Sequence, residues 1–378
     1  MRVPLLPLQT VPSADRPLVD HARLPAGLRD RLAKLALRSP PVHDKTRWKS
    51  LSIGGIERRF AQPITFTPYA SAQPCSARCG FCSENLRHSD STIAAARLRP
   101  DDAYFDGLAA ALMQLRDLPL SWSLSGLENT DDADWFLRLL DTLRNAERAG
   151  AQVEQRVLYS NGAGFAGPHS EALQDALVGL GLDWIELSRH HLDAQKNQDI
   201  MRFRDGIAVQ RSDVFEALLP KLALRIPVKL VCIVQRDGVC SADAVARYLD
   251  TACKLGASSV IFRELSKVGD DYRVNATARH ITATRVHVDT LVGELFADPQ
   301  LRGDLEPVRL TEGYYFWNLV CRWRNTLDVI FEAADYTAMH QQHDSGRIYK
   351  LVYFANGELC GGWEPGRHVL WKAPHGQQ

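Results

Sequence analysis

The chain has 378 residues, of which 45% are hydrophobic, and its 45 basic residues balance 45 acidic ones. This length and apolar content suffice for one large α/β domain, or for one domain with a smaller second one. A formal net charge of zero lacks the broad positive field of a protein that binds long nucleic acids, so we expect no DNA partner.

The N-terminal 60 residues predict a short extension without a membrane anchor. The first 17 residues contain a short apolar stretch that prolines interrupt, so they make a poor signal peptide. No later run approaches the roughly 20 apolar residues of a membrane-spanning helix. One helix is predicted near Pro25–Leu37. We therefore expect a cytoplasmic protein with no membrane partner.

A group of three cysteines follows the first predicted core strand. The segment Pro63–Ser71, PITFTPYAS, is rich in β-forming residues and leads into a loop that contains Cys75, Cys79 and Cys82. In a reducing compartment, clustered cysteines more often bind metal or act in catalysis than form disulfides. A structural zinc ion needs four ligands, usually from a second C-x-x-C or a histidine pair. The other five cysteines are scattered singly, so an iron–sulfur cluster with one open iron fits the pattern better.

Strands and helices alternate after the cysteine loop. Such alternation is typical of a parallel sheet with right-handed crossover connections. We expect the active groups at the C-terminal ends of the strands, where the connecting loops meet. In chain order, the predicted elements are a helix over 100–116, a strand and then a helix within 120–146, strands over 155–162, 182–193 and 226–238, a helix over Ala242–Leu255, and a strand over 257–265.

The last part of the chain predicts a small β-rich extension. From about Tyr314 onward, alternating segments such as IYKLVYFANGEL are typical of strands, which could close the open side or the mouth of the sheet. We therefore expect an N-terminal extension over 1–60, a central α/β domain over 61–305 and a C-terminal β-rich extension over 306–378.

The cysteine spacing resembles the signature of the radical S-adenosylmethionine (radical SAM) superfamily. It is C-x-x-x-C-x-x-C, and an aromatic residue, Phe81, precedes the third cysteine. The resemblance implies a partial (β/α)6 TIM-like barrel and one [4Fe–4S] cluster on Cys75, Cys79 and Cys82. It further implies that the open iron binds S-adenosylmethionine, with Phe81 close by. An external one-electron reductant such as flavodoxin or ferredoxin would drive cleavage to a 5′-deoxyadenosyl radical, which abstracts hydrogen from a substrate.

Residues at the ends of the second and third core strands are candidates for binding the cofactor. Ser125, Gly126 and Glu128 resemble the "GGE" stretch of the superfamily, which implies that Glu128 binds the methionyl ammonium group. The alternative is that Glu128 and Asn129 only cap the next helix. Asn161 resembles the "TNG" of several branches, and its alternative is a turn residue.

The fourth core strand ends in a polar cluster. The resemblance implies that Ser188 and Arg189 face S-adenosylmethionine, at its ribose and carboxylate. Side chains alternate along a strand, so His190 and His191 cannot both point inward, and one of them is a catalytic candidate. A two-histidine, one-carboxylate iron site with Asp193 fits such adjacent ligands badly. For either histidine, the alternative is an ordinary hydrogen-bonded loop residue.

Two further candidates lie on the sixth core strand and in the C-terminal extension. Arg263 and Glu264 occupy a buried strand, where unpaired charge is costly, so at least one should project into the barrel mouth; we favour Arg263 as a cofactor or substrate ligand. Gln235 and Arg236 hold a similar strand-end position with weaker support. Cys360 follows a predicted hairpin turn and could donate a hydrogen atom to a product radical, or it could be a simple hairpin cysteine.

The sequence favours a radical SAM enzyme that acts on a small polar molecule in a biosynthetic tailoring step. The C-terminal extension has only two cysteines, so we expect one cluster, and the N-terminal segment is too short for a cobalamin-binding domain. The substrate class expected first is a sugar, nucleoside or amino-acid derivative. The second is a ribosomally synthesised precursor peptide. A different class of function is a non-catalytic iron–sulfur or zinc scaffold.

Overall fold

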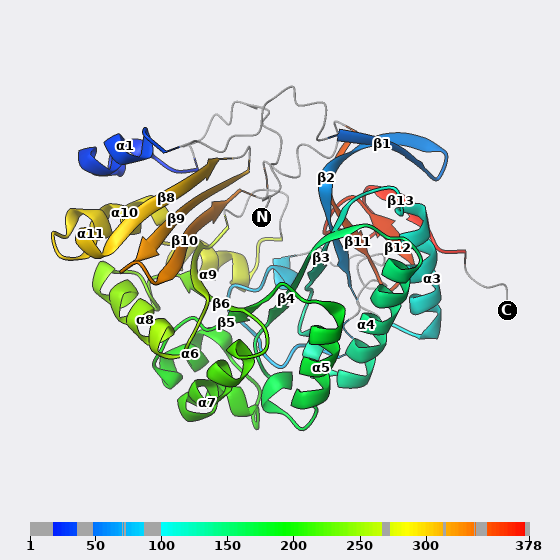
Figure 1. The fold of residues 1–378 in the computed structure, drawn as a ribbon, viewed down its shortest axis with the longest axis horizontal. Coiled ribbons are helices and arrows are strands. Elements are labelled where there is room, and N and C mark those ends of the chain that lie inside the picture. Colours follow the sequence, from blue (N-terminus) through cyan, green and yellow to red (C-terminus); the bar gives the residue numbers. More distant parts are fainter. Residues whose placement is uncertain are drawn as a thin grey trace.

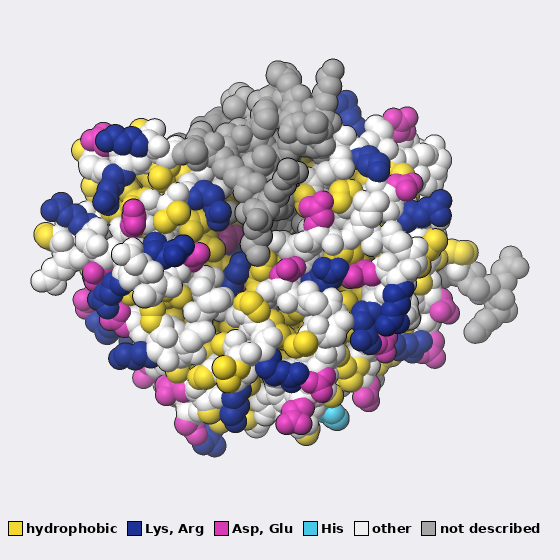
Figure 2. Space-filling view, viewed as in Figure 1, with side chains coloured by type: hydrophobic (Ala, Val, Ile, Leu, Met, Phe, Trp, Pro, Cys, Tyr) yellow, Lys and Arg dark blue, Asp and Glu magenta, His cyan; other side chains and the backbone are white. Residues whose placement is uncertain are grey.

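The structure is a computed structural model in which one large curved sheet carries helices on its outer side (Figure 1). It describes residues 18–35, 48–69, 71, 73–86, 100–266, 273–312, 315–335, 337 and 346–374. Basic and acidic side chains are interspersed over the face seen in Figure 2, in agreement with the neutral composition. Among the helices of these residues, none is long and apolar enough to cross a membrane.

Six parallel strands in chain order form the centre of the sheet. They are β2 (Ile56–Pro68), β3 (Leu120–Leu124), β4 (Val153–Ser160), β5 (Trp184–Ser188), β6 (Val228–Val234) and β7 (Ser259–Glu264). The sheet has two edge strands, and these do not pair with each other. The expected α/β fold with a partial barrel of six parallel strands is therefore confirmed, and the barrel is open.

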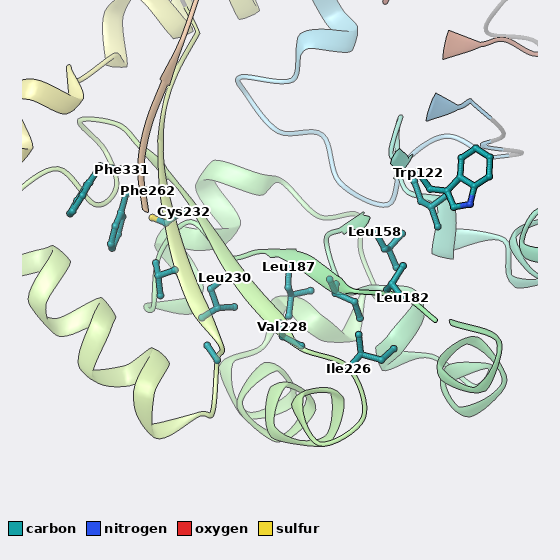
Figure 3. Close-up of a cluster of buried hydrophobic side chains, with 14 of the residues drawn as sticks. Trp122, Leu158, Leu182, Leu187, Ile226, Val228, Leu230, Cys232, Phe262 and Phe331 are labelled. Atoms are coloured by element: carbon teal, nitrogen blue, oxygen red, sulfur yellow. The ribbon is translucent and has the colours of Figure 1, made fainter. Parts of the chain in front are cut away.

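Helices between the strands cover the outer face of the sheet (Figure 1). They are α3 (Asp102–Gln114), α4 (Ala133–Arg148), α5 (Ser170–Leu180), α6 (Ala194–Met201), α7 (Ser212–Ala223) and α8 (Ala242–Lys254). The strand residues that face these helices are apolar and buried, such as Leu158, Leu187 and Phe262 (Figure 3). Burial of this face between strand and helix is the main favourable contribution to folding.

The C-terminal strands lengthen both edges of the sheet. They are β8 (Leu305–Glu312), β9 (Phe316–Trp323), β10 (Leu327–Ala334), β11 (Arg347–Tyr353), β12 (Glu358–Cys360) and β13 (Val369–Lys372). β10 pairs in parallel with β7, and β11 pairs in parallel with β2. The expected β-rich segment is present, but it does not close the sheet, because its two halves add to opposite edges. The domain boundaries at residues 60 and 305 stay a prediction.

The N-terminal part is bound to the sheet at two places. Strand β1 (Trp48–Ile53) pairs antiparallel with β2. Helix α1 (Ala26–Leu32) lies within the predicted helix, whose last two residues fall outside the described residues. The turn before α1 is bound near the β8 edge, where the Asp20 N–H donates to Asp289 and the His21 ring lies 2.9 Å from Glu312 of β8. Three more helices follow β7, namely α9 (Ala276–Thr284), α10 (Val288–Ala297) and α11 (Leu301–Asp304).

Candidate functional site

The cysteine loop is held by the C-terminal end of helix α6. The Arg78 N–H donates to the carbonyls of Met201 and Arg202, at 3.0 and 3.1 Å, and the Gly80 N–H donates to that of Ile200 at 3.3 Å. The last carbonyls of a helix have no partner within the helix, so they are available for such contacts. Helix α6, which follows β5, therefore positions the cysteine loop, which follows β2.

The three thiols of this loop are partly buried and influence one another. The Cys82 N–H donates to the Cys79 carbonyl at 3.1 Å, which turns the chain between them. Burial, and then the nearby Glu128 carboxylate, raises the pKa of Cys75 to about 12. The pKa of Cys79 is raised further by burial and by the thiols of Cys82 and Cys75. Without a cation, Cys75 and Cys79 are neutral thiols, and a metal centre would favour their thiolate form.

The donor set fits an iron–sulfur cluster better than a single ion. Among the described residues, which include the loop cysteines, no three His, Cys, Asp or Glu side chains are arranged to hold one metal ion. A single zinc ion would draw each sulfur to about 2.3 Å from one centre. A cluster instead distributes its thiolate ligands over several iron atoms. Cys75, Cys79 and Cys82 supply three such ligands from one loop.

Glu128 connects the ends of β3 and β4. Glu128 is only 2% exposed. Oε1 accepts hydrogen bonds from the Thr130 N–H (3.2 Å), the Thr130 hydroxyl (2.6 Å) and the Ser160 hydroxyl (2.9 Å), while Oε2 accepts from the Asn161 N–H (2.5 Å). Burial raises the pKa of Glu128 to about 7. Glu128 thus caps the short 3-10 helix Asn129–Asp131, whereas the helix that follows, α4, is capped by Asp132 and not by Glu128 or Asn129. The contact of Glu128 with a cofactor stays a prediction.

Asn161 joins this network to the cysteine loop. Its side-chain amide donates to the Ser76 hydroxyl at 2.9 Å and lies 3.7 Å from the Cys75 sulfur. Its Oδ1 accepts from the Ala163 N–H at 2.9 Å, as a turn residue would. The structure therefore brings together three of the predicted site residues, Cys75, Glu128 and Asn161, from three different strand ends.

Ser125 and Gly126 form the turn that leads from β3 to Glu128. Gly126 has a φ of 99°, and a Cβ there would lie 2.5 Å from the Tyr69 ring. Only glycine fits this close approach in that conformation. The Tyr69 hydroxyl donates to Glu84, just after the cysteine loop, at 2.6 Å. The Ser125 hydroxyl lies 3.1 Å from that of Ser123.

The prediction that Ser188 and Arg189 both face the cofactor is wrong for Arg189. Its guanidinium is buried, with 2% of the residue exposed, and donates to the Leu192 carbonyl (3.2 Å) and the Ser212 hydroxyl (3.1 Å). It also lies over the Phe215 ring of α7. Adjacent residues of a strand point to opposite faces, so Arg189 shares the outer face with Leu187 while Ser188 points inward.

The two histidines point to different environments, as expected. His190 is 3% exposed, its Nδ1 accepts from the Ile233 N–H at 3.1 Å, and its ring lies edge-on to Phe81, with the centroids 5.0 Å apart. Burial, then Arg263 and Arg189, lower its pKa to about 3, so the ring is neutral and Nε2 carries the proton. His191 lines a surface hollow with Lys196 and Arg247. Only His190 contacts the cysteine loop, and the catalytic role of either histidine stays a prediction.

Arg263 projects to the inner face of the sheet, on the side expected. Its guanidinium lies 3.1 Å from Glu186 and 3.2 Å from Glu332. Glu264 points to the other face, where it binds Arg285 at 2.6 Å. The charged pair of the strand is therefore neutralised on both sides of the sheet, and a ligand contact of Arg263 stays a prediction.

Cys360 is a buried thiol on the inner face. It packs with Tyr69, Val352 and Phe354. Burial, and then Glu358, raises its pKa to about 12, so it remains protonated at neutral pH. The predicted hairpin is present between β11 and β12. Tyr69 also donates to Glu84, so its side chain connects Cys360 to the turn after the cysteine loop. Its role as a hydrogen-atom donor stays a prediction.

Two buried side-chain amides near the strand ends have only a weak signal in the sequence. Within the described residues, neither the oxygen nor the nitrogen of the Asn129 and Gln235 side chains has a hydrogen-bond partner. Leaving a buried polar group unpaired costs about 1–3 kcal/mol, so such groups indicate a missing water or ligand. Asn129 follows Glu128, and Gln235 follows β6 directly. Both fit a polar organic ligand at this end of the sheet, and the sequence signal was a polar residue directly after a core strand.

Solved structures resemble the chain, whereas no protein-family model and no curated protein matches it. SuiB from Streptococcus suis bound to S-adenosylmethionine is 15% identical, with a TM-score of 0.47 over 80% of this chain, which spans 60% of SuiB. anSMEcpe with bound AdoMet is 12% identical, with a TM-score of 0.49 over 82% of this chain and 77% of anSMEcpe. HemN from Escherichia coli, described as a radical SAM enzyme, is 14% identical, with a TM-score of 0.41 over 71% of this chain and 65% of HemN. These likenesses are distant, at 15% identity or below.

Proposed function

We propose that this protein is a radical SAM enzyme. The observation that carries the proposal is the set of three thiols on one loop, fixed against Asn161 and the end of α6 at the C-terminal end of a parallel sheet. Cys75, Cys79 and Cys82 would hold one [4Fe–4S] cluster. With S-adenosylmethionine bound, this centre would supply a 5′-deoxyadenosyl radical for hydrogen abstraction, after reduction by an external one-electron donor such as flavodoxin or ferredoxin.

The residues around the loop would position the two cofactors. Asn161 holds Ser76 and the first cysteine in place, and Glu128 fixes Asn161 through its backbone N–H. The unpaired amides of Asn129 and Gln235 would hydrogen-bond the polar groups of S-adenosylmethionine. The neutral ring of His190, packed on Phe81, excludes water from the side of the loop that faces β6.

A small polar substrate is the class that we favour, in a biosynthetic tailoring step. Its support is the inner face of the sheet, where the charged groups Glu186, Arg263 and Glu332 provide polar contacts. The alternative is a ribosomally synthesised precursor peptide, because SuiB has been seen bound to the precursor peptide SuiA and anSMEcpe bound to the Cp18Cys peptide. Neither DNA nor a membrane is a partner in this proposal.

Cofactor cleavage tests the proposal directly. The anaerobically reconstituted protein, given a strong reductant, should convert S-adenosylmethionine to 5′-deoxyadenosine and methionine. Cys79→Ala should remove both the visible absorbance of the cluster and this cleavage. Cys253→Ala is the matched control, because Cys253 is an exposed cysteine of α8 outside the loop, and it should retain both. Zinc in place of iron, or cleavage that persists in Cys79→Ala, would contradict the proposal.

Isotope transfer separates the two substrate classes. Candidate metabolites and candidate peptides are supplied with deuterium at their C–H positions, and mass spectrometry shows which one passes deuterium into 5′-deoxyadenosine. Transfer from a small polar metabolite supports the first class. Transfer from a peptide, together with its retention by the immobilised protein, would favour the second.

A further inference from the structure

Lys350 lies on the inner face of the sheet, where β11 joins β2. The two strands are parallel, and Lys350 lies opposite Thr65 in their register. The next residue of each strand faces the helices, since Phe66 packs against Trp122 and Leu351 belongs to the main apolar core. Side chains alternate along strands, so Lys350 and Thr65 point to the inner face.

The Lys350 ammonium has an aromatic partner and, among the described residues, no acidic one. Its Nζ lies 3.9 Å from the centre of the Trp363 ring. In the described parts of the chain, Lys350 forms no ion pair with a carboxylate. Of the two carboxylates of the adjoining segment, Glu358 accepts from Lys372 and the Gly366 N–H, and Glu364 pairs with an arginine at 3.0 Å.

This isolation makes Lys350 unlike the other cations that we place on the inner face. Arg263 lies between the carboxylates of Glu186 and Glu332. Burial lowers the pKa of Lys229, and the nearby Glu186 carboxylate opposes that shift. For Lys350, burial alone lowers the pKa from 10.5 to about 7, with no nearby charge to offset it. An ammonium in this environment is stabilised by any anion that can reach it.

The surroundings of Lys350 connect it to the candidate site. Val352, two residues along β11, packs with Tyr69 and Cys360, and Trp363 packs against the same group. Tyr69 in turn donates to Glu84, just after the cysteine loop. Lys350 and Trp363 therefore lie beside the packed side chains, Tyr69 and Cys360 among them, that extend from the cysteine loop along the inner face.

We propose that Lys350 and Trp363 form a subsite that binds an anionic group of the substrate, a carboxylate or a phosphate. The ammonium would pair with the anion, and the indole would hold the aliphatic part of the lysine side chain in position. This proposal deepens the proposed function, on which it rests for the statement that the ligand is the substrate.

Competitive acetylation of the full, cluster-reconstituted protein tests the subsite. The rate at which acetic anhydride modifies each lysine is followed against pH by peptide mass spectrometry, because only the neutral amine reacts. Lys350 should reach its maximal rate near neutral pH. Lys372, which is half exposed and pairs with Glu358, is the internal control against which the profile of Lys350 is compared.

Two anions then serve as probes of the ligand class. Sodium sulfate stands in for a phosphate and sodium acetate for a carboxylate, with sodium chloride at equal ionic strength as reference. At about ten times its dissociation constant, the matching anion should slow acetylation of Lys350 about tenfold and leave Lys372 unchanged. Protection by sulfate only indicates a phosphate group, and protection by acetate only indicates a carboxylate. No protection beyond chloride, or a pH profile of Lys350 like that of Lys372, would overturn the proposal.

Variants separate this subsite from a packing role and from the proposed function. Lys350→Arg keeps a permanent charge and should bind the same anion with no pH dependence, whereas Lys350→Met should lose binding, both measured by calorimetry. If Lys350→Met bound the anion as the parent does, the subsite would be refuted. The same titration in Cys79→Ala gives the anion result without cofactor cleavage. A failure of radical chemistry is thereby distinguished from a failure of the subsite.

Discussion

The two faces of the sheet differ in what their residues do, and neighbouring residues of β7 illustrate the difference. Phe262 points outward, is fully buried, and stacks on Phe331 with the ring centroids 5.6 Å apart. Arg263 points inward and lies between two carboxylates. The outer face stabilises the fold by burying apolar surface against the helices, whereas the inner face carries paired charges. From this difference we expect changes on the outer face to affect stability most, and changes on the inner face to affect the proposed ligand binding.

The cysteine loop and the strand ends form a rim between these two faces. Contacts at the rim are polar and connect distant parts of the chain, as Asn161 does with Ser76. A change at the rim should therefore affect the site more than the core, and a change in the core should affect stability first. Four substitutions test this division, in order of expected effect.

Phe262→Ala should have the largest effect on stability. Removal of a buried phenylalanine leaves a cavity and costs about 3–5 kcal/mol of unfolding free energy. Denaturant unfolding followed by circular dichroism measures the loss. Under native conditions the variant should still assemble the cluster. A loss below about 1 kcal/mol would show that the outer face does not carry the stability that we assign to it.

Gly126→Ala should disturb the rim. The new Cβ would meet the Tyr69 ring in a backbone conformation that favours glycine, at a cost of about 2–3 kcal/mol. Gly181→Ala is the matched control. Gly181 has a φ of 73° with no atom within 4 Å of a new Cβ, so only the backbone cost of about 1 kcal/mol remains. Binding of S-adenosylmethionine should weaken in Gly126→Ala and not in Gly181→Ala. Equal binding in both variants would show that the turn at Gly126 does not take part in the binding site.

Arg263→Met should cost about 1–2 kcal/mol, because it leaves Glu186 and Glu332 facing each other. Burial already raises the pKa of Glu186, and Arg263 opposes that shift, so the variant should raise it further. A carboxyl whose folded pKa lies above its unfolded value stabilises most at low pH and loses that contribution as pH rises through the folded pKa. The variant should therefore be least stable at neutral pH. Adding Glu186→Gln should restore part of the loss; no rescue would contradict the assigned pairing.

Cys232→Ala should have the smallest effect, about 1 kcal/mol, since one small buried group is lost from the outer face. Iron content and cofactor cleavage should match those of the parent protein. Because Cys232 is a cysteine outside the loop, iron analysis of the variant also checks that the cluster depends on Cys75, Cys79 and Cys82. Loss of iron would place Cys232 among the ligands.

Local patterns predicted the elements well, and contacts between distant segments were predicted less well. The helix expected over Ala242–Leu255 is α8, Ala242–Lys254. The prediction for Arg189 is wrong because residue type alone does not fix the direction of a side chain. The alternation along the strand places Arg189 on the outer face. The split of the C-terminal strands between β7 and β2 was not expected, since strand pairing across the chain leaves no mark in a local pattern.

The sequence by itself determined the alternation of strands and helices, the apolar outer face and the spacing of the three cysteines, because periodicity and local spacing are properties of short segments. Only the tertiary structure decided which polar groups meet. It placed Asn161 beside Cys75, 86 residues away, and Arg263 beside Glu332, 69 residues away. It also left Lys350 on the inner face without a carboxylate partner among the described residues. Such pairings depend on the order and register of the strands in the sheet, which packing of the whole chain decides.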